Sequence, residues 1–210
     1  MGKTSITSPI VPVNETGKAV DLEHTITENS TDEAITTYNR ACKRLLNPQL
    51  WHQLSGGLSA SFKLSNPGDP DPHRLAVVND YLAIDIPGPG PEAGDGYDWV
   101  QVESITEKAD PGSEESFGMT VRATSNPDKP GEGTAHFFKE GATSTFLIKR
   151  TGNKVTASYH GRNELPNTKE VAIADKIRNS LVAIGALAGL SELQWTAFIK
   201  GLLQKEIGGK

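Results

Sequence analysis

The amino-acid sequence predicts an α+β domain with a curved, mainly antiparallel sheet, which could also close into a small β-barrel. Between residues 58 and 160, several segments alternate apolar with polar residues, a pattern typical of strands with one buried face. Helical spacing of apolar residues occurs only before and after this region. Parallel strands would need helical crossovers between them, so the strand-rich middle favours antiparallel connections. We therefore expect an N-terminal helix and a C-terminal helical hairpin packed against the sheet.

The first 29 residues are predicted to lie outside this domain, which then spans residues 30–210 as a single unit. They are rich in Ser, Thr and Glu and contain no aromatic residue, which is typical of a flexible tail. An alternative is that the tail acts as a strand, because Val20, Leu22 and Ile26 alternate with polar residues. Such a strand would add to the sheet edge of a neighbouring subunit.

A helix is predicted to begin at residue 30. Residues 30–33 match the capping box S-x-x-E, in which side chains bind the unpaired backbone N–H groups of the first helical turn. Asn47 and Pro48 should interrupt this helix, because the residue before a proline avoids the α conformation. A short second piece should end at Gly56 and Gly57. The apolar residues of the two pieces are Ile35, Tyr38, Cys42, Leu45, Leu46, Leu50, Trp51 and Leu54.

Strands are predicted wherever the period of two recurs. Residues 58–64 form the first half-buried strand, and residues 74–86 form either two short strands or one bent strand. Residues 87–96, PGPGPEAGDG, are expected to form a loop, because proline lacks the backbone N–H that a helix or a central strand needs. Further strands are expected around residues 99–105, 117–121 and 135–138.

The clearest segment is a β-hairpin over residues 143–160. Its two arms each alternate in hydrophobicity, and Thr151, Gly152 and Asn153 lie between them. Gly and Asn tolerate the positive φ angle that a tight hairpin turn demands. The hairpin therefore specifies its own register.

Two helices are predicted at the C-terminal end. The first covers residues 171–188 and should end at Gly189, because glycine is common immediately after a helix. Residues 191–194 form a second capping box, S-x-x-Q, which should start the last helix. A link this short should make the two helices antiparallel. The apolar face of the last helix consists of Trp195, Phe198, Ile199 and Leu202.

Composition narrows the environment and the partners. The 210 residues carry a net charge of -5, so neither nucleic acid nor an anionic membrane surface is expected as a partner. The single cysteine, Cys42, is predicted to fill core space and has no intrachain disulfide partner. The longest apolar run is about half the ~20 residues of a membrane helix, and no secretory signal is visible. We expect a cytoplasmic protein, without a cofactor because no nucleotide-binding or catalytic motif occurs.

Four residues are candidates for acid–base or anion-binding chemistry. His160, Arg162 and Glu164 place a titratable base, a planar cation and a carboxylate within five positions at the end of the hairpin, and His136 lies on another predicted strand. An enzyme would use His160 as the general base and Arg162 to bind an anion. The favoured interpretation is structural, because neighbours in sequence on a strand often point apart.

Asp69, Asp71 and His73 could act as metal ligands, since carboxylate and imidazole groups bind divalent ions. Prolines at positions 70 and 72 fix an extended path between them. The favoured interpretation is therefore a rigid turn, and no metal is assigned.

The favoured function is a non-catalytic component that binds protein partners or assembles with itself as a homo-oligomer. It rests on the missing catalytic motifs and on the apolar faces at both ends of the chain. One alternative is a small hydrolase that uses His160, Arg162 and Glu164. Another is a β-barrel that binds a small ligand or carbohydrate, with Tyr97, Trp99 and Tyr159 as stacking surfaces. The candidate partner-binding residues are Trp195, Phe198, Leu202, Val20 and Leu22.

Overall fold

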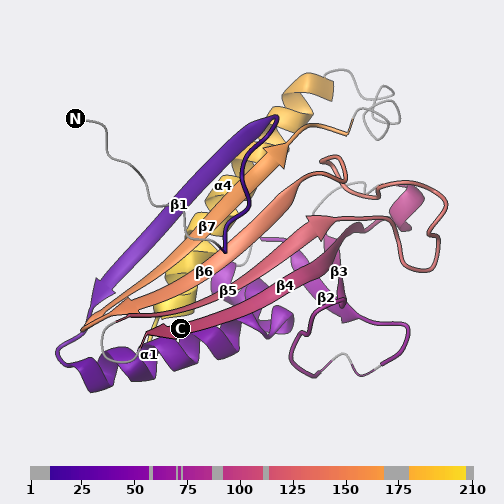
Figure 1. The fold of residues 1–210 in the computed structure, drawn as a ribbon. Helices are drawn as coiled ribbons and strands as arrows, with labels where there is room; N and C mark the ends of the chain where they lie inside the picture. The colour runs from indigo at the N-terminus through magenta and orange to yellow at the C-terminus, as the bar shows by residue number, and fades with distance from the viewer. Residues whose placement is uncertain are drawn as a thin grey trace.

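The computed structural model describes residues 10–56, 59–69, 71, 73–86, 92–110, 114–167 and 180–206. The strands in these ranges are β1 (Lys18–Thr27), β2 (Ser61–Ser65), β3 (Tyr81–Asp85), β4 (Asp98–Asp110), β5 (Glu114–Ala123), β6 (Thr143–Thr151) and β7 (Lys154–Glu164). They form one curved antiparallel sheet in the order β1-β7-β6-β5-β4-β3-β2 (Figure 1). The predicted α+β class is confirmed. In the described ranges β1 and β2 do not pair, so the sheet is open and not a closed barrel.

Strand β1 comes from the segment that was predicted to be a tail. It pairs along its length with β7 of the same chain, for example His24 with Ala157. This differs from both expectations for the tail, a flexible segment and a strand added to another subunit. The preceding Ile10 is also buried, and it packs where a side chain on Gly118 of β5 would stand. The alternation around Val20 is therefore satisfied within the chain.

The N-terminal helices follow the predicted boundaries. Helix α1 (Thr31–Leu45) begins at the cap Ser30, whose Oγ accepts a hydrogen bond from the Glu33 backbone N–H at 3.2 Å. Helix α1 ends before Pro48, and the short helices η1 (Pro48–Leu50) and α2 (Trp51–Ser55) follow. Gly56, with a φ of 85°, ends α2 as expected, while Gly57 lies outside the described residues.

The hairpin of β6 and β7 is confirmed. Thr151 pairs with Lys154, so the turn consists of Gly152 and Asn153, and Gly152 adopts a φ of 59°. Strands β2 to β5 continue the sheet by antiparallel pairing. Of the expected loop at residues 87–96, residues 87–91 lie outside the described residues, and Glu92–Gly94 form a 3-10 turn, η2.

Two predicted strand segments are loops in the structure. Before β3, the carboxylate of Asp80 is fully buried and accepts hydrogen bonds from Arg74, Asn66 and the Val77 backbone. These bonds fix a turn in place of the first of two short strands. Residues 135–138 also form a loop, whose isolated bridge joins Phe138 to Pro166.

The C-terminal end contains helix α4 (Ser180–Leu203). The predicted break at Gly189 is absent from it, so the described residues contain one long helix where a hairpin was expected; residues 171–179 lie outside them. A glycine inside a helix costs only about 1 kcal/mol relative to alanine, and Gly189 does not take the positive φ of a C-cap.

Helix α4 runs along β7 and β1 on one face of the sheet and also contacts α1 and α2 (Figure 1). A Cβ on Gly201 would lie 2.3 Å from the Leu54 backbone oxygen, so this glycine permits the close approach of α4 to α2. The described helices include none that is long and apolar enough to cross a membrane.

Candidate functional site

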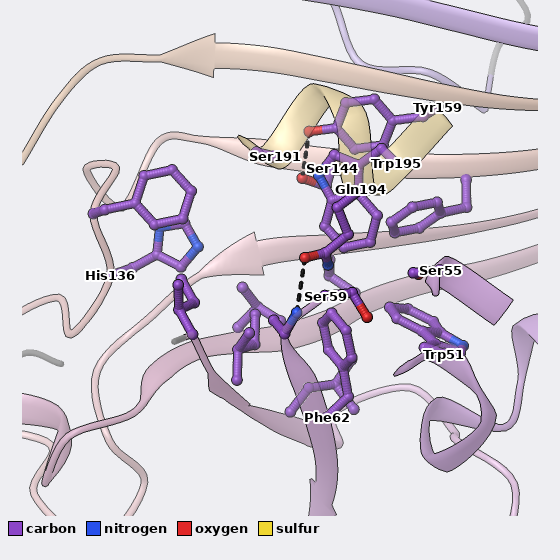
Figure 2. A pocket seen from close by; sticks show the side chains of 18 of the residues that line it. Trp51, Ser55, Ser59, Phe62, His136, Ser144, Tyr159, Ser191, Gln194 and Trp195 are labelled. Atoms are coloured by element: carbon purple, nitrogen blue, oxygen red, sulfur yellow. Dashed lines mark hydrogen bonds between the residues drawn. The ribbon is translucent and has the colours of Figure 1, made fainter. Parts of the chain in front are cut away.

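A cavity of about 340 Å³ lies between α4 and the sheet (Figure 2). Its walls come from α2, from the inner face of β2 to β7, from the loop before β6 and from α4. The apolar lining residues are Trp51, Ala60, Phe62, Leu82, Ile84, Ile86, Val100, Val121, Phe137, Phe138, Phe146, Tyr159, Leu193 and Trp195. The polar lining residues are Ser55, Ser59, His136, Ser144, Ser191 and Gln194. None of these described lining residues is Asp, Glu, Lys or Arg, so the part of the cavity wall that they form carries no formal charge at neutral pH.

Aromatic rings build one end of the cavity. Trp51 contacts three of these rings, with ring centroids 5.0 Å from Phe62, 5.2 Å from Phe146 and 6.3 Å from Trp195. Trp195 also stacks on Tyr159, with centroids 5.4 Å apart and an angle of 16° between the ring planes. Rings that pack on one another in this way form a rigid wall, because each holds its neighbour in one rotamer.

The strands form an aliphatic wall of the cavity, because every second side chain of a strand points to the same face of the sheet. Leu82, Ile84, Val100 and Val121 all project from β3, β4 and β5 into the core on the side of α4. Val102, the next inward residue on β4, is completely buried in the core and does not line the cavity. The boundary between filled core and cavity therefore runs between Val100 and Val102.

A chain of hydrogen bonds leads from the cavity wall to a buried carboxyl group. Ser144 Oγ lies 3.2 Å from the Tyr159 hydroxyl, which donates to Glu164 Oε1, also at 3.2 Å. A Cβ on Gly161 would lie 2.1 Å from Glu164 Oε1, so the missing side chain at this position makes room for the carboxyl group. This chain of hydrogen bonds therefore depends on four residues: Ser144 of β6, and Tyr159, Gly161 and Glu164 of β7.

The surroundings of Glu164 include some influences that raise the pKa of its carboxyl group and others that lower it. Burial raises the pKa of this carboxyl group above its usual value, and the charge of Glu192 on α4 adds to the effect. The hydrogen bond from Tyr159 and the positive charges of Lys18 and Arg162 favour the ionised form. Burial also raises the pKa of Tyr159, so its hydroxyl keeps the proton.

His136 lines another part of the cavity, on the opposite side from Trp51 in Figure 2. Burial lowers the pKa of His136 to about 3, so the imidazole is neutral at pH 7. Its Nδ1 accepts a hydrogen bond from the Phe138 backbone N–H at 2.9 Å. The proton of the neutral ring therefore lies on Nε2, which can only donate. Asn167 holds the loop in place by donating to the His136 backbone oxygen at 3.1 Å.

Two further polar groups lie at the cavity wall. Gln194 of α4 accepts a hydrogen bond from the Ala60 backbone N–H at 3.0 Å, which ties the helix to the segment before β2 (Figure 2). The hydroxyl group of Ser55 is buried and has no hydrogen-bond partner among the described residues. A buried hydroxyl without a partner costs about 1–3 kcal/mol, unless something in the cavity binds it.

Ser59 and His52 resemble a catalytic serine and its histidine base, but His52 cannot act as the base of Ser59. His52 Nδ1 lies 3.1 Å from Ser59 Oγ and 3.0 Å from the Ser59 backbone oxygen. A carbonyl oxygen only accepts, so Nδ1 must carry the proton and cannot take one from the serine. Ser59 Oγ instead donates to the His52 backbone oxygen at 3.1 Å.

The structure separates the three acid–base candidates of β7. His160 and Arg162 both contact Asp21 of β1, at 2.5 and 2.6 Å, whereas Glu164 contacts Tyr159 at the cavity wall. Burial acts to raise the pKa of Asp21, but the hydrogen bonds from His160 and Arg162 lower it. The partner Asp21 was missed because it lies in the segment predicted to be a tail. Of the four candidates, His136 lines the cavity and Glu164 reaches it through Tyr159.

The metal candidates are used in other contacts. Asp69 pairs with Arg74 at 2.7 Å, Asp71 Oδ1 accepts from the His73 backbone N–H, and the His73 ring contacts Gln49. The described residues contain no group of three or more His, Cys, Asp or Glu side chains that could hold a metal ion.

The stacking candidates divide between two places. Tyr159 lines the cavity, whereas Trp99 packs against Ala83 and Ala135 in a separate cluster and donates its indole N–H to Gly94. Tyr97 contacts the Trp99 ring with centroids 6.4 Å apart. These two rings therefore do not contribute to the cavity.

The partner-binding candidates are mostly directed inward. Phe198 and Leu202 have no exposed surface, and Val20 is 7% exposed. Leu22 and Trp195 are partly buried against the same core. These five residues therefore offer little apolar surface to another chain, and self-association and protein partners stay predictions.

Several residues of the cavity wall were not identified from the sequence as site residues. Trp51 and Phe62 were assigned to core faces, and Gln194 was assigned to a helix cap. Ser144 carried a usable signal, because it is a polar residue in the inward-facing series that continues with Phe146 and Ile148. A serine in such a register suggests that the inner face of the sheet is not filled by apolar packing alone.

Comparison with protein-family models and with curated proteins finds no match. Among solved structures, Ms6760 from Mycobacterium smegmatis has a TM-score of 0.41 and 14% identity, covering 90% of this chain and 91% of that chain. A protein from Arthrobacter aurescens has a TM-score of 0.40 and 11% identity, with coverages of 94% and 93%. Norcoclaurine synthase from Thalictrum flavum in complex with dopamine and hydroxybenzaldehyde has a TM-score of 0.33 and 15% identity, with coverages of 90% and 88%. Similarities this weak carry no inference about function.

Proposed function

We propose that this protein binds a small, uncharged, mostly apolar organic molecule in the cavity between α4 and the sheet. The observation that carries the proposal is the cavity itself, about 340 Å³ of space lined mainly by aromatic and aliphatic side chains. Protein cores are normally close-packed, with few voids larger than a water molecule. Ligand pockets have volumes of about 300–1,000 Å³ and combine an apolar lining with a few polar groups, as this cavity does.

The lining supports an uncharged ligand. An ion moved from water into an apolar site loses solvation free energy, and the described lining residues include no opposite charge to compensate it. The polar side chains among the described lining residues are all neutral: Ser55, Ser59, His136, Ser144, Ser191 and Gln194. They suit single hydroxyl, carbonyl or ether groups on the ligand.

The same lining favours an apolar molecule over a carbohydrate. A sugar presents hydroxyl groups on most of its carbon atoms, and each one buried without a partner is costly. The six neutral polar side chains of the described lining, of which Ser59 and Gln194 already bond to the protein, cannot satisfy them all. An aromatic or aliphatic ligand instead gains about 25 cal/mol for each Å² of apolar surface that it buries against rings such as Trp51 and Phe62.

Titration with a neutral fluorescent probe tests the proposal. N-phenyl-1-naphthylamine should become strongly fluorescent on entering the cavity, with saturation at one molecule per chain. The probe should be displaced by smaller neutral aromatics such as 2-methoxynaphthalene. A phenylalanine at Val100, which lines the cavity, should abolish this binding. Unsaturable fluorescence, or binding that survives in the Val100→Phe variant, would refute the proposal.

A further inference from the structure

The chain from Ser144 through Tyr159 to Glu164 has a direction. An ionised carboxylate only accepts hydrogen bonds, so the single proton of the Tyr159 hydroxyl is directed at Glu164 Oε1 at 3.2 Å. The Tyr159 oxygen is then left as an acceptor. Ser144 Oγ, 3.2 Å away, must supply the proton of the second bond. Both hydroxyl protons therefore point away from the cavity and towards Glu164.

The direction of the hydrogen bonds determines whether Ser144 can donate or accept a hydrogen bond at the cavity wall. A serine hydroxyl has one proton and two acceptor lone pairs. With its proton committed to Tyr159, Ser144 Oγ can only accept from a group in the cavity that it lines. His136 has the opposite polarity, because its Nε2 carries a proton and can only donate. Ser144 and His136 thus have opposite hydrogen-bonding polarity, and they line different parts of the cavity (Figure 2).

Polarisation strengthens the acceptor site. Hydrogen bonds in a chain reinforce one another, and a negative charge at its end makes every oxygen along it a better acceptor. The charge at Glu164 lies close to Lys18 on β1 and Arg162 on β7, which favour the ionised form, and to Glu192 on α4, which opposes it. Lys18 itself forms an ion pair with Glu192, which offsets that opposition. The carboxylate thus acts on a ligand that it does not touch.

We propose that the ligand is an apolar molecule with a hydroxyl group, either an alcohol or a phenol, and that this hydroxyl donates a hydrogen bond to Ser144 Oγ. Tyr159 and Glu164 are positioning residues that hold Ser144 in the accepting orientation. The inference rests on the proposed function, because it identifies the chemical class of the ligand for the same cavity.

A matched pair of probes tests the donor requirement. 2-Naphthol and 2-methoxynaphthalene have the same ring, and both can accept a hydrogen bond, but only 2-naphthol can donate one. Their affinities are measured by displacement of N-phenyl-1-naphthylamine at neutral pH. A hydrogen bond to a polarised acceptor should make 2-naphthol bind about 10-fold more tightly than 2-methoxynaphthalene.

Variants test whether this selectivity arises from the chain of hydrogen bonds through Ser144, Tyr159 and Glu164. In Ser144→Ala the ratio of the two affinities should fall to about 1, and Ser144→Thr, which keeps the hydroxyl, should retain it. Tyr159→Phe should lower the ratio about threefold or more, because the Ser144 proton loses its acceptor. The control is Ser158→Ala, since Ser158 bonds His160 and does not line the cavity. Thermal melting of each variant identifies any that fails to fold.

The outcomes separate this inference from the proposed function. If the fluorophore does not bind saturably, the proposed function fails and the inference fails with it. If the fluorophore binds but neither naphthalene displaces it, the inference alone fails. If both bind equally well to the unmodified protein, the cavity binds ligands but the hydroxyl class is wrong. A 10-fold ratio that survives in Ser144→Ala would also overturn the inference, because the hydroxyl group would then bind elsewhere.

Discussion

The hydroxyl group of Tyr159 donates a hydrogen bond to Glu164 Oε1 at 3.2 Å, and the two residues lie on the same strand. In a regular strand, residues five positions apart project from opposite faces. Here the strand is irregular at its end, where Asn163 has a φ of 56° and the pairing with β1 shifts its register between Lys18 and Val20. The irregularity turns Glu164 towards the inner face, while His160 and Arg162 contact Asp21.

Substitution of two valines on β4 should distinguish the cavity from the filled core. Val100→Phe places a ring in the cavity, so the variant should keep its stability within about 1 kcal/mol and lose the fluorescent probe. Val102→Phe inserts the same ring where no space exists and should cost about 1–3 kcal/mol. Chemical denaturation gives both values. Equal destabilisation of the two variants would show that the cavity does not accept the ring.

Gly161→Ala should disturb the Glu164 carboxyl group. The new Cβ would lie 2.1 Å from Oε1, so the side chain must move or the strand must shift, at a cost of about 1–3 kcal/mol. Shortening Glu164 to alanine in the same chain removes the clash. The double variant should therefore be more stable than the sum of the two single effects predicts. Strict additivity in denaturation experiments would contradict the contact.

Gly201→Ala should weaken the packing of α4 on α2. Its Cβ would lie 2.3 Å from the Leu54 backbone oxygen, and backbone cannot move aside as a flexible side chain can. A loss of about 3 kcal/mol or more is expected, although alanine favours the helix by about 1 kcal/mol. Gly141→Ala is the control, because no atom lies within 4 Å of its added Cβ. A stable Gly201→Ala variant would contradict the close approach.

Acidification should destabilise the fold through His136. The pKa of this group falls from 6.5 to about 3 on burial, so the unfolded chain binds a proton in this range and the folded chain does not. The stability associated with the neutral, buried form of His136 is fully present above pH 6.5 and is lost as the pH falls towards 3. At pH 5 the loss is about 2 kcal/mol, at about 1.4 kcal/mol for each pH unit. His136→Asn keeps an acceptor for the Phe138 N–H but cannot titrate. Melting temperatures at pH 7 and pH 5 should therefore change less in this variant; an unchanged difference would assign the acid sensitivity to other groups.

Protonation of Glu164 should change the ligand preference of the cavity. Its pKa is raised, mainly by burial, and a protonated carboxyl group can donate to Tyr159 and reverse the direction of the chain. The preference for 2-naphthol over 2-methoxynaphthalene should then fall as the pH decreases through this pKa. In Glu164→Gln the preference should no longer depend on pH. Displacement titrations from pH 8 to pH 4 would reveal either behaviour.

The parts of the fold that local patterns specify were predictable. The hairpin followed from its alternating arms and the Gly152–Asn153 turn, and the start of α1 followed from the Ser30 capping box. The break expected at Gly189 was wrong, because a local preference of about 1 kcal/mol is smaller than the packing energy of a long helix. Assigning residues 18–27 to a tail overlooked that β7 had an edge to which they could pair.

The cavity could not be predicted in the same way. Trp51, Phe146 and Trp195 come from three distant segments, and each alone shows the pattern of an ordinary core residue. Whether such residues fill the interior or leave space depends on the distance between α4 and the sheet. No period in the sequence encodes that distance. The candidates chosen for their chemistry, His160 and Arg162, were grouped by sequence proximity, which a twisted strand does not preserve.

The chain contains three tryptophans, and two of them, Trp51 and Trp195, form part of the cavity wall, whereas Trp99 lies in a separate cluster. The protein therefore carries its own optical sensor. With Trp99 replaced by phenylalanine, all remaining indole emission would originate beside the cavity. Occupancy by a non-fluorescent compound could then be followed without any dye, through the colour and lifetime of that emission.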